Sequence, residues 1–76
     1  MEIKIYSTPT CPYCKMAKQY LSTKGIPYRD FDVSTNQAAL EEMVKLSGQM
    51  GVPVIVINDQ IIVGFDKTRI DSLLET

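Results

Sequence analysis

Residues 2–24, EIKIYSTPTCPYCKMAKQYLSTK, join a strand-like segment to a helix-like segment through a short loop. Residues 2–6 alternate polar and apolar side chains and include β-branched ones, which predicts a half-buried strand. Pro12 suits the first position of a helix, because its ring fixes φ and its missing N–H would have no partner there. Apolar residues at helical spacing extend the helix to Lys24, and Gly25 then ends it.

The rest of the chain continues in short strands and helices. Ser34 and Gln37 have the S-x-x-Q form of a capping box, which marks the start of a helix. Residues 58–60 form a short polar gap between two apolar runs, which predicts a hairpin turn. The pattern predicts, in order, a strand over 28–33, a helix capped by Ser34 and ended by Gly48, strands over 52–57 and 61–64, and a short helix capped by Asp66.

The predicted order is βαβαββα, within a single α/β domain that spans residues 1–76. The first two strands are joined through a helix and are expected to be parallel, with a right-handed crossover. The last two strands are expected to form an antiparallel hairpin. One mixed four-stranded sheet with helices on both faces is the simplest arrangement that buries all the apolar faces.

Composition and charge exclude several classes of function. Lys and Arg number 8 against 9 Asp and Glu, so the net charge of −1 argues against a nucleic-acid or anionic-membrane partner. No apolar run has the length of a membrane span, and the N-terminus lacks the pattern of a secretory signal. We therefore expect a cytoplasmic protein, and a monomer.

The chain contains two cysteines and no histidine. Catalysis by a Ser-His-Asp or Cys-His arrangement is thereby excluded, and the two thiols cannot complete a four-ligand zinc site. A disulfide between Cys11 and Cys14 would close a very small loop, which stabilises a fold by only about 2 kcal/mol. Stabilisation of the fold by a disulfide is therefore a poor explanation for the presence of these two cysteines.

The sequence Cys11-Pro12-Tyr13-Cys14 falls at the predicted strand-to-helix turn, which favours thiol redox chemistry. Unpaired N–H groups at a helix N-terminus favour an anion, so Cys11 is expected to be the attacking thiolate. Cys14 lies one turn inside the helix and is expected to point toward the sheet as the resolving thiol. Two alternatives remain: half of a metal site completed by a partner, or two incidental cysteines.

Over almost all of its length the sequence resembles a glutaredoxin, within the thioredoxin-like fold. The segments that carry the resemblance are Ile5-Tyr6, residues 10–15, Gly51-Val52-Pro53, Ile57-Asn58 and Gly64-Phe65-Asp66. The resemblance implies that Cys11 attacks, that Cys14 resolves and that Pro53 is cis. It also implies that the backbone of Val52 pairs with an incoming peptide or with glutathione. An ordinary edge-strand proline is the alternative for Pro53.

Glutathione carries two carboxylates, so the resemblance implies cationic or N–H donors around its groove. The candidates are Gln49, Lys15 and the N–H groups of Phe65 and Asp66 at the start of the last helix. Asp66 would also meet the ammonium of the γ-glutamyl end, and Tyr13 would form a wall of the groove. The alternatives are that Asp66 is a plain N-cap, Lys15 a solvated surface residue and Tyr13 a surface aromatic without a role.

The sequence departs from the usual glutaredoxin pattern at three places. Thr8 stands where many members have Lys, Gly51 where Thr is frequent, and Phe65 where Cys or Ser often follows Gly-Gly. Phe65 is also typical of related redoxins that accept electrons from thioredoxin reductase and supply ribonucleotide reductase.

The sequence thus predicts a glutathione-dependent thiol–disulfide oxidoreductase that reduces protein disulfides or glutathione mixed disulfides. Glutathione would be its co-substrate, with no bound cofactor and no metal. The reductase-linked redoxin is the first alternative. The second is a binding module in which Cys11 from two chains and two glutathione thiols hold an iron–sulfur cluster.

Overall fold

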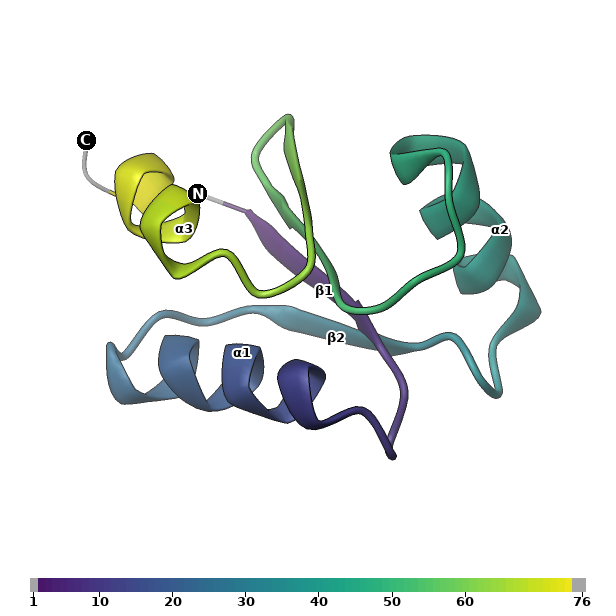
Figure 1. Ribbon diagram of the computed structural model, residues 1–76, viewed down its shortest axis with the longest axis horizontal. Coiled ribbons are helices and arrows are strands. Elements are labelled where there is room, and N and C mark those ends of the chain that lie inside the picture. The colour runs from purple at the N-terminus through teal and green to yellow at the C-terminus, as the bar shows by residue number, and fades with distance from the viewer. Residues whose placement is uncertain (1, 75–76) are drawn as a thin grey trace.

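The computed structural model describes residues 2–74, and the order of its elements confirms the predicted βαβαββα pattern (Figure 1). The elements are β1 (Ile3–Ser7), α1 (Pro12–Thr23), β2 (Arg29–Asp32), α2 (Gln37–Ser47), β3 (Val54–Ile57), β4 (Gln60–Val63) and α3 (Lys67–Leu74). Within residues 2–74, no helix has the length and apolar character needed to cross a membrane.

The four strands form one mixed sheet in the order β2-β1-β3-β4. β1 runs parallel to β2, with Ile5 opposite Asp30, and antiparallel to β3, with Ile5 opposite Ile55. β3 and β4 form the predicted antiparallel hairpin. The two most buried strands, β1 and β3, are central in the sheet. The carboxyl end of β1 lies beside the amino end of β3, where Tyr6 is opposite Val54.

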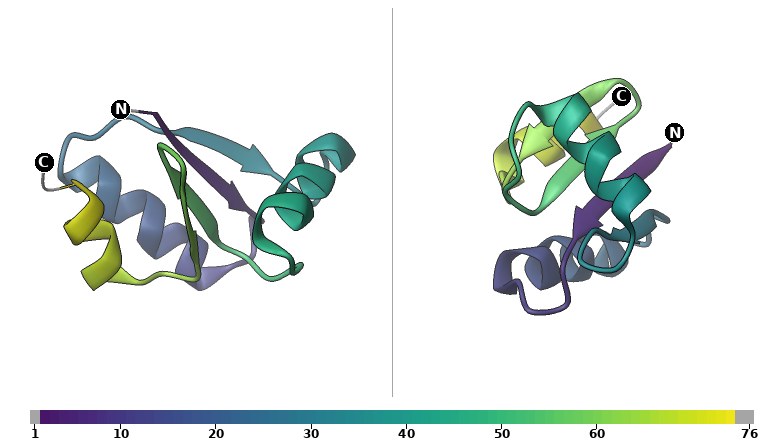
Figure 2. Two further views of the ribbon diagram at one scale, coloured as in Figure 1. Left: turned by 90° about the horizontal axis from the view of Figure 1, so that it is seen from above. Right: turned by 90° about the vertical axis from the view of Figure 1, so that its right-hand side faces the viewer.

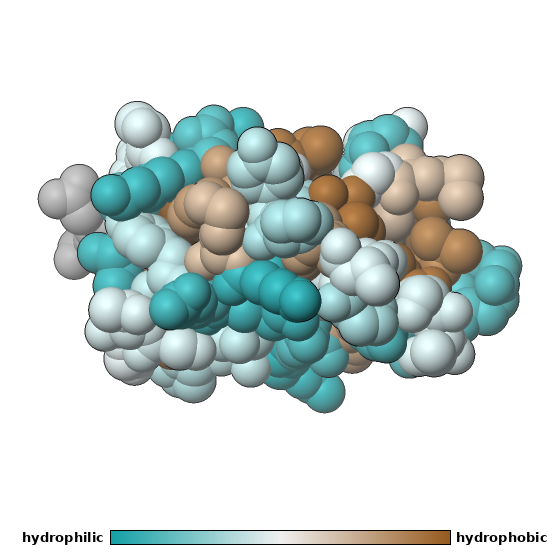
Figure 3. Space-filling view, turned by 60° about the horizontal axis from the view of Figure 1, so that its bottom comes forward, coloured by the Kyte–Doolittle hydropathy of each residue, from teal (hydrophilic) through white to brown (hydrophobic). Residues whose placement is uncertain are grey.

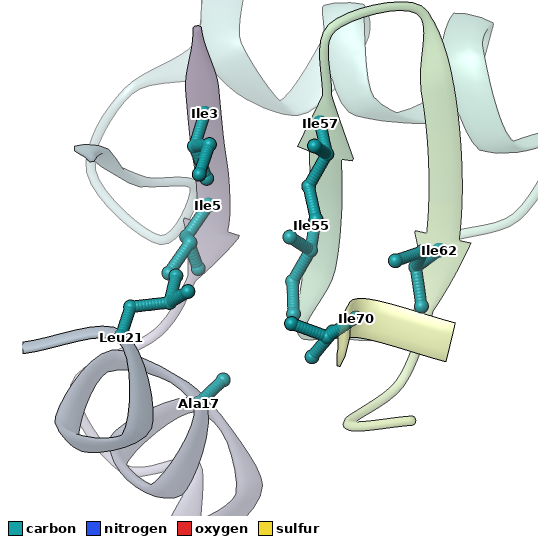
Figure 4. Close-up of a cluster of buried hydrophobic side chains, with 8 residues drawn as sticks. All are labelled: Ile3, Ile5, Ala17, Leu21, Ile55, Ile57, Ile62 and Ile70. Atoms are coloured by element: carbon teal, nitrogen blue, oxygen red, sulfur yellow. The ribbon is translucent and has the colours of Figure 1, made fainter. Parts of the chain in front are cut away.

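Helices cover both faces of the sheet, as predicted, with α1 and α3 on one face and α2 on the other (Figure 2). Successive strand residues point to opposite faces, so each central strand contributes to two cores. The first core lies under α1 and α3 and contains Ile3, Ile5, Ala17, Leu21, Ile55, Ile57, Ile62 and Ile70 (Figure 4). The second lies under α2 and contains Tyr6, Val33, Ala39, Met43, Val54 and Val56.

The predicted cap of α2 is wrong. The N-cap is Asn36 rather than Ser34, and its Oδ1 accepts the N–H of Ala39 at 3.0 Å. Ser34 belongs instead to the turn that precedes the helix, where both its N–H and its hydroxyl donate to Oδ1 of Asp32. An aspartate at the end of a strand forms such a turn readily, and it competes for the serine that would otherwise cap the helix.

The strand ends differ slightly from the predicted ones. β3 begins at Val54 rather than at residue 52, because Pro53 has no N–H to donate to a ladder. In each of the other three strands, both ends differ from the predicted ends by one residue. Gly48, with φ of 73°, ends α2 as predicted, and Gly64, with φ of 86°, follows β4. This second glycine leads the chain from the hairpin to α3.

Candidate active site

The two cysteines lie where the loop after β1 becomes α1. Cys11 is the N-cap, with an extended backbone, and Pro12 is the first helical residue. The N–H of Cys14 donates to Sγ of Cys11, at a distance of 3.2 Å. The sulfur thus replaces the oxygen of an ordinary N-cap side chain, and it receives one of the N–H groups that a helix leaves unpaired at this end. Negative charge on this sulfur is stabilised by the same contact.

The two thiols differ in their surroundings. Cys11 is partly exposed, whereas Cys14 is fully buried and faces the sheet, as the sequence predicted. Burial raises the pKa of Cys14 to about 11, and the hydrogen bond to Cys11 adds to this effect. The backbone of Thr8 and the charge of Lys18 act in the opposite direction. The pair is therefore divided into an accessible sulfur and a protected thiol directly behind it.

This division predicts unequal alkylation of the two thiols. In the reduced protein, iodoacetamide is expected to modify Cys11 first, and Cys14 only slowly until the pH approaches about 11. The rate at each thiol against pH, followed by peptide mass, gives the measurement. Faster modification of Cys14 at neutral pH would reverse the assignment of the two sulfurs.

A second chain segment meets Cys11 from the loop before β3. The thiol of Cys11 donates to the carbonyl oxygen of Val52 at 3.8 Å, although the two residues are 41 positions apart. The peptide bond between Val52 and Pro53 is cis, in agreement with the resemblance. Among residues 2–74 the N–H of Val52 donates no hydrogen bond, and Pro53 is buried with its carbonyl bound to the N–H of Gly64. The backbone of Val52 therefore lies beside the exposed sulfur, outside the sheet ladder.

The side chain of Gln49 is bound within its own loop. Its amide nitrogen donates to Oγ of Ser47 and to the carbonyl of Gly51, and its Oε1 accepts the N–H of Gly51 at 2.5 Å. A Cβ at residue 51 would lie 2.6 Å from Oε1 of Gln49, so this arrangement requires glycine there. Gln49 thus shapes the loop that leads to Val52, and its carboxamide is engaged by Ser47 and Gly51.

The segment after β4 brings Phe65 and Asp66 to the start of α3. Phe65 is half-buried and packs edge-to-face on Tyr20 of α1, with ring centroids 5.7 Å apart. Oδ1 of Asp66 accepts the N–H of Arg69 at 3.1 Å, which confirms the predicted cap. The side chain of Phe65 thus belongs to the packing between α1 and α3, while the N-terminus of α3 remains as a source of N–H groups.

Tyr13 and Lys15 lie on the surface of α1. Tyr13 is 62% exposed, and Lys15 is exposed beside the buried Cys14. With the face that carries α1 turned forward, hydrophobic areas are separated by hydrophilic residues (Figure 3). Among residues 2–74, no group of three or more His, Cys, Asp or Glu side chains is placed to hold a metal ion.

Three polar residues behind Cys14 were not predicted from the sequence. Lys18 donates to Oδ2 of Asp30 at 3.1 Å and to Oγ of Ser7 at 3.3 Å, and Ser7 donates to Oδ1 of Asp30 at 2.7 Å. The only available signal was that Lys18 follows Cys14 by four residues and so shares its helix face. Ser7 and Asp30 lie on the neighbouring parallel strands β1 and β2, two positions apart in register, and no local pattern reveals their contact.

A family model for glutaredoxins matches residues 3–62, which include both cysteines and the loop of Val52. The chain belongs to the glutaredoxin family. Its fold is the thioredoxin-like fold, which it shares with solved glutaredoxin and thioredoxin-like structures.

Two bacterial relatives have sequences similar to this glutaredoxin-family chain. A glutaredoxin-like 8.6 kDa protein from a rubredoxin operon of Clostridium pasteurianum is 56% identical, over 96% of this chain and 97% of that protein. Glutaredoxin 3 of Escherichia coli is 45% identical, over 84% of this chain and 77% of its own length.

One solved structure similar to this chain is that of a redoxin described as glutaredoxin-like. The Escherichia coli NrdH-redoxin, described as a glutaredoxin-like protein with a thioredoxin-like activity profile, aligns with a TM-score of 0.86 at 25% identity. The alignment covers all of this chain and 99% of that one.

Proposed function

We propose that this protein is a glutathione-dependent thiol–disulfide oxidoreductase that reduces protein disulfides or glutathione mixed disulfides. The observation that carries the proposal is the division of the thiol pair: the accessible sulfur of Cys11 accepts an N–H at the start of α1, and buried Cys14 lies one turn behind it. A reducing compartment, the cytoplasm, suits a dithiol in this state.

The proposed reaction has two exchange steps. The thiolate of Cys11 attacks one sulfur of the substrate disulfide, a new S–S bond forms, and the other substrate sulfur leaves as a thiolate and takes up a proton. Cys14, after loss of its proton, attacks Cys11 and releases the reduced substrate. Two glutathione molecules then reduce the Cys11–Cys14 disulfide and leave as glutathione disulfide, so the two electrons come from glutathione.

The backbone near Cys11 supports binding of a peptide-like substrate. The unpaired N–H of Val52 and its carbonyl oxygen can bond to the main chain of glutathione as a short added strand. The N-terminus of α3, at Phe65 and Asp66, offers N–H groups to the γ-glutamyl carboxylate. Tyr13, two residues after Cys11, is exposed and available as a wall of the groove, and the exposed Lys15 adds a positive charge on the same helix.

Turnover of a glutathionylated peptide tests the proposal. With reduced glutathione as reductant, the protein is expected to remove glutathione from the peptide at a saturable rate. The matched control is the same peptide carrying cysteine in place of glutathione, since it keeps the disulfide but lacks the γ-glutamyl and glycyl parts. Equal rates with both peptides would contradict recognition of glutathione.

A substitution at Thr8 is expected to strengthen glutathione binding. Thr8 stands where many glutaredoxins have Lys, and a charge-assisted hydrogen bond contributes roughly 1.5–3 kcal/mol when it is shielded from solvent. Because Thr8 is only half-buried, Thr8→Lys is expected to lower KM for a glutathionylated peptide by at least about threefold. Thr10→Lys, on an exposed residue of the same loop, is the control. An unchanged KM in Thr8→Lys would place the glycyl carboxylate elsewhere.

A specific residue also favours a second candidate, a redoxin reduced by thioredoxin reductase that supplies electrons to ribonucleotide reductase. Phe65 departs from the polar residue that often follows Gly-Gly in glutaredoxins, and it presents an apolar ring beside the N-terminus of α3. The similarity to NrdH-redoxin agrees with this candidate.

A further inference from the structure

The buried thiol of Cys14 presents a problem for the second exchange step. Only a thiolate attacks a disulfide, and because burial raises the pKa of Cys14 to about 11, this thiol is almost entirely protonated at neutral pH. The reaction therefore needs a group that favours the Cys14 thiolate once Cys11 is part of a mixed disulfide.

Formation of the mixed disulfide removes some of the contributions that raise the pKa of Cys14. Burial raises its pKa most, and the hydrogen bond and the charge of Cys11 also raise it. Both contributions from Cys11 depend on its free sulfur, so they are lost when that sulfur is bonded to the substrate. The backbone of Thr8 and the charge of Lys18, which both lower the pKa, remain. Lys18 is then the positive side-chain charge that lowers the pKa of Cys14.

The ammonium of Lys18 is held in place by two partners from the sheet. It lies one helical turn after Cys14 on the inner side of α1, where its side chain is only 24% exposed. Asp30 on β2 binds it at 3.1 Å, and Oγ of Ser7, at the end of β1 and almost fully buried, accepts from it at 3.3 Å. Ser7 donates in turn to Asp30, which closes a triangle of three contacts.

This triangle differs from an ordinary surface ion pair. A free lysine would extend into water, where its charge would be screened from a buried sulfur. Here the hydroxyl of Ser7 and the carboxylate of Asp30 hold the ammonium on the sheet side of α1, the side toward which Cys14 is buried one turn earlier. No charged group of β3, β4 or α3, within the described part of the chain, is among those that act on Cys14.

We propose that Lys18, held by Asp30 and Ser7, is a positioning residue that stabilises the Cys14 thiolate in the resolving step. The proton of Cys14 goes to solvent, the thiolate attacks Cys11, the Cys14–Cys11 bond forms and the bond from Cys11 to the substrate breaks. The departing thiolate takes a proton from solvent. This inference rests on the proposed dithiol reaction, and it does not depend on glutathione being the reductant.

The two exchange steps can be followed separately with a chromogenic aromatic disulfide. Attack by Cys11 releases the first coloured thiolate, in a phase that depends on reagent concentration. Attack by Cys14 releases the second, in a phase that does not. Lys18→Met keeps the aliphatic stem and Lys18→Arg keeps the charge. Lys45→Met is the control, because it removes an exposed charge from α2 on the other face of the sheet.

Lys18→Met is expected to slow the second phase at least about twofold at neutral pH, since a rise in thiol pKa lowers the thiolate fraction more than it raises nucleophilicity. The midpoint of the pH–rate profile of that phase should move upward by about half a unit or more. Lys18→Arg and Lys45→Met should both behave as the unsubstituted protein, and the first phase should be unchanged in all variants. An unchanged first phase also shows that the site of Lys18→Met is folded.

Two outcomes would overturn the inference: a second phase in Lys18→Met with the same rate and pH profile as in the unsubstituted protein, or an equal slowing in Lys45→Met. Failure of the proposed function has a different signature. If the second release is missing in the unsubstituted protein, or persists in Cys14→Ser, then Cys14 is not the resolving thiol at all.

Discussion

Cys11→Ser is expected to lower reduction of disulfides at least about a thousandfold, to the uncatalysed background, because a serine hydroxyl is not ionised at neutral pH and forms no disulfide. Cys11 is the accessible sulfur of the pair, and its sulfur, at the N-cap of α1, is the one that a substrate can reach. The substitution keeps a capping oxygen in place of the sulfur, so the fold should be retained.

The measurement is the steady-state rate of disulfide reduction, together with far-ultraviolet circular dichroism as a check of folding. Ser22→Ala, which removes an exposed hydroxyl near the end of α1, is the control variant. Substantial turnover by folded Cys11→Ser would contradict the assignment of the nucleophile.

Cys14→Ser is expected to stop the reaction after its first step. With no thiol behind Cys11, the mixed disulfide persists, and glutathione disulfide should leave an adduct of one glutathione on the protein. Reduction of protein disulfides should fall about a hundredfold or more, because an oriented intramolecular thiol is replaced by a dilute external one. Removal of glutathione from a peptide needs only Cys11 and external glutathione, so it should continue.

Intact mass and peptide mapping of the Cys14→Ser adduct give the measurement. The adduct should lie on Cys11 and should disappear on addition of excess reduced glutathione. Unimpaired reduction of protein disulfides by Cys14→Ser would show that resolution does not need the buried thiol.

The sequence predicts the strands and helices well because their signals are local. Alternation in residues 2–6, Pro12 at the first helical position and Gly48 after α2 each act within a few residues. The exposed and buried states of Cys11 and Cys14 follow from the same local geometry, since a residue three positions into a helix turns toward the sheet.

The features that the sequence did not predict depend on competition between hydrogen-bond partners or on contacts between residues far apart in the chain. Asn36 replaced Ser34 as a cap because Asp32 had already engaged the serine. The carboxamide of Gln49 is bound within its own loop, a contact that requires the backbone path as well as the residue type. The triangle around Lys18 requires the pairing of β1 with β2, which no window of sequence contains.

The source of electrons separates the proposed function from the second candidate, and one measurement compares them. A disulfide substrate is supplied with NADPH and either glutathione with glutathione reductase or thioredoxin reductase alone, and NADPH consumption is followed. The proposed function predicts rapid turnover with the glutathione system and little with thioredoxin reductase. Turnover with thioredoxin reductase and none with glutathione would contradict the proposed function and favour the redoxin indicated by Phe65.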